Sequence, residues 1–366
     1  MIENRNYQRS IENVAELPLP WEKLEEKNFL ITGARGLIGS FLIDVLMYQN
    51  RMKHLNCHIY AMGRSKERGK QRFPEYWQDA NFSFLAQDIN LPLIGFEAQT
   101  VHYIFHMASN THPVAYATEP VATITSNIIG TKNLLDFAIE HGTQRFAFAS
   151  SNEIYGENRG DTELFDEQYC GYIDCNTLRA GYPESKRCGE ALCQAYRRQY
   201  GMDIVIPRFT RTYGPTMLKS DTKAISQFIC KGLAGENIVL KSEGTQYYSY
   251  TYVADAVSGA LVVLLSGTDG EAYNIADERS DIMLKDLAGI IAEIVGTGVM
   301  FEFPDEVEKA GFSKATKARL DAAKLRRLGW QAKYDIREGL QETLKIMSSG
   351  SFEINHDLST KSYIKN

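Results

Sequence analysis

Tyr182 and Lys186 are the two residues whose types and spacing most directly predict chemistry in this 366-residue chain. They lie four positions apart where a long helix is predicted from about Pro183 to Tyr200, so both side chains should share one helix face. A nearby ammonium group stabilises a phenolate, so we expect Lys186 to move the pKa of Tyr182 from about 10 toward neutrality. A phenol of that kind can exchange a proton with a substrate hydroxyl. Because any long helix can contain this spacing by chance, the prediction depends on the elements around it.

A strand, a glycine-rich turn and a helix are predicted near the start of the chain. The apolar run Phe29–Ile31 has the character of a buried strand, and apolar residues recur at helical spacing from Ser40 to Tyr48. The glycines between them suit a dinucleotide, because Gly33 permits a tight turn, Gly36 lets the backbone approach a pyrophosphate and Gly39 lets the helix pack closely. The alternative is an ordinary turn. The residues predicted to contact the cofactor here are Gly33, Arg35, Gly36, Leu37, Ile38 and Gly39.

Short apolar runs recur along the chain after this turn, with helical patterns between them. The predicted strands are His58–Met62, Phe82–Leu85, Val101–His106, Arg145–Ser150 and Asp203–Pro207. This alternation predicts an α/β fold, a Rossmann-type doubly wound parallel sheet with a smaller C-terminal α/β substrate domain. The predicted boundaries are an N-terminal arm at 1–27, a dinucleotide-binding domain at 28–207 plus about 246–265, a substrate-binding domain at 208–245 and 266–347, and a tail at 348–366.

Length and composition point to an ordinary globular protein with room for two domains. The chain has 44% hydrophobic and 23% charged residues and a formal net charge of −6. That charge argues against nucleic acid or an anionic membrane as the main partner, and no apolar run approaches the roughly 20 residues needed to span a bilayer. The N-terminus has no signal-peptide core. Six cysteines without C-x-x-C pairs predict reduced thiols in a cytoplasmic protein, and no metal site is expected.

The motif Thr-Gly-x-x-Gly-x-x-Gly at 32–39 resembles the extended branch of the short-chain dehydrogenase/reductase superfamily, and in particular the NAD-dependent epimerase/dehydratase family. Within that family, the chain is similar to UDP-glucuronate decarboxylases over about residues 28–345. The resemblance implies that Tyr182 and Lys186 are catalytic and that Ser151 hydrogen-bonds the reacting oxygen, with Ser150 the less favoured candidate. It also implies a homodimer. Further cofactor contacts implied in this way are Asp88, Ile89, Ala108 and Ser109.

Glu153 is the residue that best separates the reactions of this branch. It stands in Ser-Asn-Glu-Ile-Tyr-Gly at 151–156, which resembles Thr-Ser-Glu-Val-Tyr-Gly of UDP-glucuronate decarboxylases and Thr-Asp-Glu-Val-Tyr-Gly of dTDP-glucose dehydratases. The Asp of the dehydratases is replaced by Asn152, which cannot donate a proton in the same way. A carboxylate beside a transient keto sugar can remove a proton next to the carbonyl or support loss of a carboxyl group. The alternative is that Glu153 only holds a loop or the substrate.

Two positions depart from the nucleotide-sugar enzymes that this chain resembles. Arg211 stands where those enzymes usually have Asn near the substrate diphosphate, and Tyr248 stands where they carry a diphosphate-binding Arg. Arg211 could supply the phosphate contact that Tyr248 cannot, because a guanidinium group suits phosphate in either place. The alternative is that the substrate is held differently, or is a different activated sugar or polyol. The predicted substrate contacts are Asn152, Arg211 and Tyr248.

The end of the second predicted strand bears on the choice of dinucleotide. An acid near this point holds the ribose 2′-OH of NAD, whereas an Arg nearby suits the 2′-phosphate of NADP. The chain has Gly63 and Arg64 there and no acid, so NADP is favoured over NAD. The alternatives are that Arg64 is solvated or that it stacks on the adenine of NAD.

These residues lead to three hypotheses for function. The first is an NAD(P)-dependent lyase or isomerase of the epimerase, dehydratase or decarboxylase type, in which a nucleotide sugar passes through a transient keto sugar and Glu153 assists the later step. The second is a reductase that consumes NADPH to convert a nucleotide-linked keto sugar or polyol precursor to an alcohol. The third is a non-catalytic dinucleotide-binding protein, which the intact Ser151, Tyr182 and Lys186 oppose.

Overall fold

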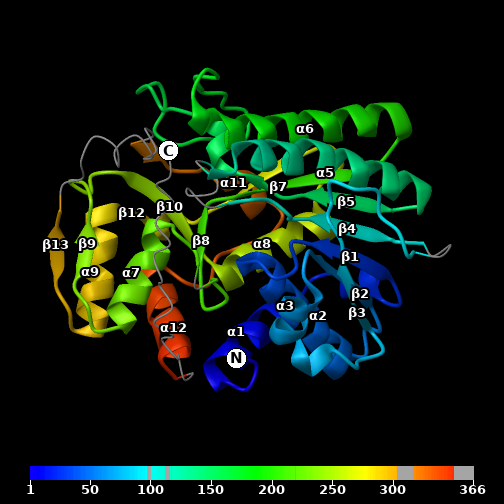
Figure 1. The fold of residues 1–366 in the computed structure, drawn as a ribbon, viewed down its shortest axis with the longest axis horizontal. Helices are drawn as coiled ribbons and strands as arrows, with labels where there is room; N and C mark the ends of the chain where they lie inside the picture. The colour runs from blue at the N-terminus through cyan, green and yellow to red at the C-terminus, as the bar shows by residue number, and fades with distance from the viewer. Residues whose placement is uncertain (97–99, 112–115, 117, 219, 303–315, 350–366) are drawn as a thin grey trace, which may run out of the picture.

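The computed structural model describes residues 1–96, 100–111, 116, 118–218, 220–302 and 316–349 (Figure 1). Its centre is an eight-stranded sheet in which the main strands run in the order β3-β2-β1-β4-β5-β7-β11 and are all parallel. The order reverses beside β1, as in doubly wound folds, so the predicted fold class is confirmed. The strands are β1 (Asn28–Thr32), β2 (His58–Gly63), β3 (Phe82–Ala86), β4 (Tyr103–His106), β5 (Arg145–Phe148), β6 (Ser150–Ser151, paired with β7), β7 (Ile204–Phe209) and β11 (Ala272–Ile275).

Helices cover both faces of this sheet (Figure 1). On one face lie α5 (Pro120–Glu140) and α6 (Gly181–Tyr200), which pack along each other, and on the other lie α2 (Leu37–Lys53) and α8 (Val253–Ser266). The strands supply alternate side chains to the two resulting cores, so that in β1 Phe29 and Ile31 enter one core and Leu30 enters the other. The short helix α3 (Lys66–Arg72) packs beside β3.

Two small sheets and their helices form the remainder of the structure, seen at the left of Figure 1. One sheet joins β8 (Arg211–Tyr213), β10 (Tyr247–Tyr252), β12 (Asp281–Met283) and β14 (Lys317–Ala318), and the other joins β9 (Ile238–Leu240) and β13 (Val299–Phe301). The helices here are α7 (Ala224–Leu233), α9 (Leu284–Val295) and α12 (Ile336–Ser349), whereas the short helix α11 (Ala323–Arg326) packs against β11 and α8. No helix in the described ranges has both the length and the apolar composition of a membrane span.

The N-terminal region differs most from the sequence-based expectation. Residues 1–27 were expected to form an arm without assigned structure, yet they contain the helix α1 (Arg5–Ala15), capped by the Asn4 side chain. Its Tyr7 is fully buried and donates a hydrogen bond to Asp44 of α2, which also accepts from Arg72. On its other side, Asn13 donates to the Tyr334 hydroxyl at 2.8 Å. The helix therefore joins the large sheet's helices to the C-terminal part of the chain.

Two other boundaries also differ from expectation. Strand β11 lies in the range 266–347 that was expected in the substrate domain, but it pairs with β7 and extends the large sheet. Parallel pairing with an edge strand, which a local pattern does not reveal, places it there. Helix α12 continues to Ser349, and residues 350–366 of the expected tail lie outside the described residues.

Candidate active site

The glycine-rich turn joins β1 to α2 and forms a close-fitting cradle. Gly33 has a φ of +67°, and a Cβ there would lie 2.8 Å from the backbone of Met107 and Ala108. A Cβ at Gly39 would lie 2.6 Å from the Gly33 carbonyl oxygen. Gly36 precedes the first residue of α2 and has no side chain to cap it, so the first N–H groups of the helix remain available to an anion. These features fit a dinucleotide pyrophosphate.

The other predicted cofactor contacts follow neighbouring strands at the same edge of the sheet. The Thr32 hydroxyl accepts a hydrogen bond from the backbone N–H of Ala108 at 3.1 Å, which ties the end of β4 to the glycine turn. Ser109 follows Ala108 directly. After β3, the Ile89 carbonyl accepts from Asn133 of α5 at 2.9 Å. The structure therefore brings the following predicted residues to one edge of the sheet: Gly33, Arg35, Gly36, Leu37, Ile38, Gly39, Asp88, Ile89, Ala108 and Ser109.

Ser151 and Tyr182 meet beyond the end of β5. Ser151 is the last residue of β6, which pairs with β7 next to the sheet edge, and Tyr182 is the second residue of α6. The Ser151 hydroxyl lies close enough to Tyr182 to lower the pKa of the phenol. The ring of Tyr182 also stacks on Tyr116, with centroids 4.9 Å apart, so its hydroxyl has a defined position. The pair predicted from the sequence is therefore brought together.

Lys186 lies one helical turn after Tyr182 and is buried against the end of β5. Its ammonium donates to the Ala149 carbonyl oxygen at 2.9 Å and lies 4.8 Å from the centre of the Phe148 ring. Burial lowers the pKa of Lys186 to about 8. The ammonium group of Lys186 therefore lies against the backbone just after β5. Its charge changes within the pH range in which activity can be measured.

The expected effect of Lys186 on Tyr182 is not what the structure shows. Burial raises the pKa of Tyr182, the charge of Glu153 raises it further, and the nearby Ser151 hydroxyl and Arg179 only partly oppose this. The ammonium of Lys186 is directed to Ala149 rather than to the phenol. The expectation of a pKa lowered toward neutrality is therefore wrong for the free protein, because desolvation outweighs the opposing interactions.

The charge on Lys186 predicts an alkaline limit to activity. The lysine is charged below its pKa of about 8 and neutral above it, so kcat/KM should fall as the pH rises through about 8 if the ammonium is required. In a Lys186→Arg variant the group stays charged, so the alkaline limb should move to higher pH. The measurement is kcat/KM against pH for both proteins. An unchanged alkaline limb in the variant would contradict the role given to Lys186.

Glu153 forms a two-point ion pair with Arg179, a residue that the sequence interpretation did not single out. The distances are 2.8 Å from Nη1 to Oε2 and 2.9 Å from Nη2 to Oε1. The Arg179 guanidinium also lies 4.8 Å from the centre of the Tyr116 ring, on which Tyr182 stacks. Arg179, Tyr116, Tyr182 and Glu153 thus form one cluster. The only sequence signal for Arg179 was its position three residues before Tyr182.

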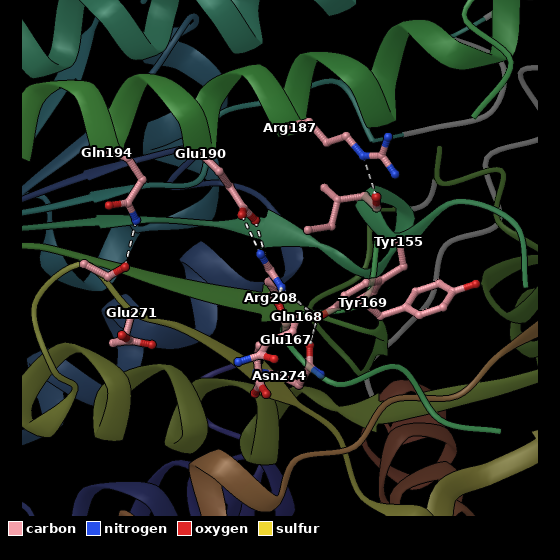
Figure 2. Close-up of polar contacts among 12 residues, drawn as sticks. Tyr155, Glu167, Gln168, Tyr169, Arg187, Glu190, Gln194, Arg208, Glu271 and Asn274 are labelled. Carbon is pink, nitrogen blue, oxygen red and sulfur yellow. Dashed lines mark hydrogen bonds and ion pairs between the residues drawn. The ribbon is translucent and has the colours of Figure 1, made fainter. Parts of the chain in front are cut away.

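The turn that carries Glu153 is held against α6 by a second arginine. This turn is the short helix η3 (Asn152–Tyr155), in which the N–H of Glu153 donates to the Ser151 hydroxyl. The Arg187 side chain donates to the Ile154 carbonyl at 2.7 Å (Figure 2). Asn152 is buried at the start of the turn, beside Ser151. The predicted catalytic and substrate residues of this segment therefore have a fixed relation to the helix of Tyr182.

Below this turn, a buried ion pair connects α6 to β7, as Figure 2 shows. Arg208 contacts both carboxylate oxygens of Glu190, at 2.6 and 3.0 Å, and their side chains are 10% and 14% exposed. Arg208 also donates to the Tyr155 hydroxyl at 2.9 Å, and that hydroxyl donates to Asn274 of β11 at 2.6 Å. The network fixes the turn of Glu153 relative to three elements of the sheet and its helices.

Removing the carboxylate of this ion pair should strongly destabilise the protein. A Glu190→Leu variant leaves the Arg208 charge buried and unpaired, which typically costs about 3–5 kcal/mol. Urea unfolding of the variant and the wild type measures the difference. The control is Glu293→Leu, which removes the partner of Arg337 on the surface and should leave the unfolding midpoint unchanged. Equal effects of both substitutions would contradict the structural role of the buried pair.

The two positions that depart from the resembling enzymes lie in contact with each other. The Arg211 guanidinium lies 3.4 Å from the centre of the Tyr248 ring, a stacked cation–π arrangement. Both residues are on paired strands, β8 and β10. Nη1 of Arg211 is buried and has no hydrogen-bond partner among the described residues. Sequence alone identified the two positions separately, and the structure shows that they form a unit.

Comparison with known proteins identifies the family. The chain matches the NAD dependent epimerase/dehydratase family over residues 29–276. It is 32% identical over 321 residues to UDP-glucuronic acid decarboxylase 1 of Xenopus tropicalis, with 87% of this chain and 72% of that protein covered. It is also 32% identical over 317 residues to UDP-glucuronic acid decarboxylase 3 of Arabidopsis thaliana, with 85% and 86% covered.

Solved structures agree with this result. UDP-glucose 4-epimerase of Thermotoga maritima has a TM-score of 0.74 at 25% identity, with 87% of this chain and 98% of that chain covered. The sequence and the fold of this chain therefore match the same group of proteins. The chain also has the glycine cradle at the end of β1 and the cluster of Ser151, Tyr182 and Lys186. The chain belongs to the NAD dependent epimerase/dehydratase family.

Proposed function

We propose that this enzyme converts a nucleotide sugar through a transient keto sugar, in a reaction of the epimerase, dehydratase or decarboxylase type. The observation that carries the proposal is the position of the Glu153 carboxylate, which lies close enough to Tyr182 for its charge to raise the tyrosine pKa. A proton-transferring phenol and a second acid–base group beside it are what a reaction with a keto intermediate requires.

The residues act in a defined order. Tyr182, in its deprotonated phenolate form, takes the proton of a sugar hydroxyl, at C4, while Ser151 hydrogen-bonds the same oxygen and aligns it. A dinucleotide held at the glycine turn of Gly33, Gly36 and Gly39 would supply the reversible hydride transfer at that carbon. Glu153 then removes a proton next to the new carbonyl or supports the loss of a carboxyl group. Tyr182 finally returns its proton to the oxygen as the alcohol forms again.

The resting position of Glu153 constrains its part in this sequence. Both carboxylate oxygens contact Arg179 in the free protein, so at least one contact must be shared or broken when Glu153 acts as a base. Its relatives named UDP-glucuronic acid decarboxylases make UDP-glucuronic acid the first substrate to test. We propose a lyase on that substrate, with an isomerase as the other outcome.

The Arg211–Tyr248 unit is proposed to bind the substrate diphosphate. A planar guanidinium held flat on an aromatic ring presents its N–H edge outward, which suits a phosphate oxygen. The buried, unpartnered Nη1 of Arg211 supports this role. Asn152, buried next to Ser151, is proposed to contact the sugar. The small sheet that contains β8 and β10 then belongs to the substrate-binding half, with the large sheet as the dinucleotide-binding half.

A reductase is the second candidate function. The absence of an acid at Gly63-Arg64 favours NADP over NAD as the dinucleotide, and Arg211 and Tyr248 depart from the usual diphosphate contacts. A net reduction of a nucleotide-linked keto sugar or polyol precursor by NADPH would use Tyr182 as the proton donor. In that reaction Glu153 would have no chemical role.

Two further proposals concern the setting of the enzyme. Helix α5 exposes apolar side chains, among them Val121, Ile124 and Ile129, and we propose that α5 and α6 form the interface of a homodimer. The six cysteines are all free in the structure, which supports a cytoplasmic enzyme. A monomer mass in solution would contradict the homodimer. Fewer than six titratable thiols in protein taken from a lysate would contradict the cytoplasmic location.

One experiment separates the two candidate functions. The purified protein is analysed for bound nucleotide by absorbance and mass, and is then incubated with UDP-glucuronic acid and other nucleotide sugars with product analysis. The first function predicts a retained dinucleotide and conversion of a sugar without net consumption of cofactor. A protein that is isolated without nucleotide, and that oxidises NADPH only when a keto substrate is added, would support the reductase instead.

A further inference from the structure

We propose that His106 is a positioning residue for Tyr182, and that a buried line of hydrogen bonds through it fixes the start of α6 relative to the glycine turn. The inference rests on the proposed function only in taking Tyr182 as the group that exchanges a proton with the substrate. His106 is the last residue of β4, and it is fully buried. No step of the proposed reaction uses its imidazole as an acid or a base.

The line begins at the last residue of β1. Thr32 and His106 are opposite each other in the parallel pair β1–β4, and Oγ1 of Thr32 lies 2.9 Å from Nδ1 of His106. The same oxygen accepts hydrogen bonds from the backbone N–H groups of Met107 and Ala108, each at 3.1 Å. These two bonds occupy both lone pairs of the hydroxyl oxygen, so Thr32 donates its hydrogen to Nδ1.

This direction determines the tautomer of His106. A neutral imidazole that accepts at Nδ1 carries its proton on Nε2. Nε2 then donates to the Thr131 hydroxyl of α5 at 3.1 Å, and that hydroxyl donates to the Asn127 carbonyl at 2.5 Å. Burial lowers the pKa of His106 well below its ordinary value, and the charge of Lys186 lowers it further, so the imidazole stays neutral.

The other end of the line holds the first turn of α6. The Nδ2 group of Asn127 donates to the Ser185 hydroxyl at 2.9 Å, and this hydroxyl donates to the backbone carbonyl of Tyr182 at 2.8 Å. The residue before the helix, Ala180, supplies no capping side chain. The hydrogen bonds of Ser185 therefore restrain a helix end that has no side-chain cap.

The line is buried along its whole length. Its members, none of them more than 2% exposed, are Thr32, His106, Asn127, Thr131 and Ser185. Because water does not reach these groups, the loss of one partner leaves a buried donor or acceptor unsatisfied. Helices α5 and α6 pack along each other on one face of the sheet (Figure 1), so the line runs from the sheet through α5 to α6.

This arrangement sets the distance between the dinucleotide and the phenol. At one end Thr32 holds the backbone of Met107 and Ala108, against which Gly33 packs. At the other end lies Tyr182. A proton must leave the sugar oxygen while hydride leaves the adjoining carbon, and a displacement of about 1 Å between reacting groups can cost about 100-fold in rate. A break in the line should therefore lower kcat more than it weakens binding.

A Thr131→Val variant interrupts the line at its middle. Valine has nearly the same shape as threonine, but it can neither accept from His106 nor donate to Asn127. We expect kcat for the nucleotide sugar that the protein turns over to fall by about 10- to 100-fold, while the KM and the Kd of NAD⁺ stay within about threefold. Thr131→Ser keeps the hydroxyl and should restore kcat to within about threefold of the wild type.

Thr343→Val is the matched control. Thr343 of α12 is also fully buried, and its hydroxyl donates to the carbonyl four residues earlier, that of Gly339, at 2.7 Å. The substitution removes the same kind of bond at a place outside the line, so kcat should stay close to that of the wild type. Thermal unfolding reports the stability of both valine variants. A folded Thr131→Val with wild-type kcat, or an equal loss of kcat in Thr343→Val, would overturn the proposal.

Nitrogen NMR of the wild-type protein tests the tautomer without turnover. In protein labelled with ¹⁵N at histidine, the His106 signals are those lost in His106→Gln or, if that variant does not fold, those that shift in Thr131→Ser. At about pH 7 they should show a proton on Nε2 and none on Nδ1. A proton on Nδ1, or on both nitrogens, would refute the line and leave the proposed reaction intact. Wild-type turnover by Tyr182→Phe would instead refute the proposed reaction.

Discussion

A Tyr182→Phe variant is expected to lose about 10²- to 10⁴-fold in kcat, the usual contribution of a positioned acid–base group. The substitution removes only the hydroxyl that would exchange a proton with the sugar. The ring can keep its stacked contact with Tyr116, at a centroid distance of 4.9 Å, so the fold should persist. Steady-state turnover of the active substrate, with thermal unfolding as a check of the fold, measures the effect.

Tyr196→Phe is the matched control for this variant. It removes a hydroxyl from the same helix, where Tyr196 donates to Asp136 on the side of α5. Turnover should be close to that of the wild type, because the hydrogen bond of this hydroxyl is to Asp136 and not to the residues of the proposed active site. Turnover of Tyr182→Phe within a few fold of the wild type would refute the role of Tyr182 under either candidate function.

A Glu153→Gln variant is expected to stop the reaction after the first hydride transfer. An amide cannot take up the proton next to the keto group, so product formation should fall by about 10²- to 10⁴-fold. The first step needs Tyr182 and Ser151 and should continue. The reduced dinucleotide should therefore accumulate in the protein, which single-turnover absorbance of the reduced nicotinamide detects.

The control for this variant is Glu163→Gln, which alters another carboxylate paired with an arginine, Arg319. Its side chain is 92% exposed, so turnover should not change. If Glu153→Gln forms product at the wild-type rate, the carboxylate only holds the loop through Arg179. That result would favour the reductase, in which Glu153 has no chemical task.

Local sequence patterns were sufficient to predict the helices, strands and turns that are formed by one continuous stretch of the chain. The glycine spacing after Phe29–Ile31 predicted a strand, a tight turn and a helix, because each glycine has a separate steric reason to be there. Tyr182 and Lys186 could be placed on one helix face from their spacing. The alternation of apolar runs and helical patterns predicted the parallel sheet, since parallel strands need crossover helices.

Features that depend on contacts between distant segments could not be predicted. The Arg179–Glu153 ion pair joins a loop to a turn, and a lone arginine in a polar loop has no local pattern that reveals its partner. Helix α1 is polar on average, and its buried face is explained by contacts with segments outside the helix, such as those of Tyr7 with Asp44 and of Ser10 with Tyr252. The pKa of Tyr182 depends on the depth of burial, which outweighed the charge effect that the spacing suggested.

The central claim is that a sugar is oxidised at one carbon, transformed beside Glu153 and reduced again with the same hydride. The most direct test uses UDP-glucuronic acid carrying deuterium at C4, incubated with the dinucleotide-loaded protein in ordinary water. The account predicts that the deuterium is found in the sugar product and that no cofactor is consumed. A product without deuterium, or one mole of reduced dinucleotide consumed for each mole of product, would contradict it.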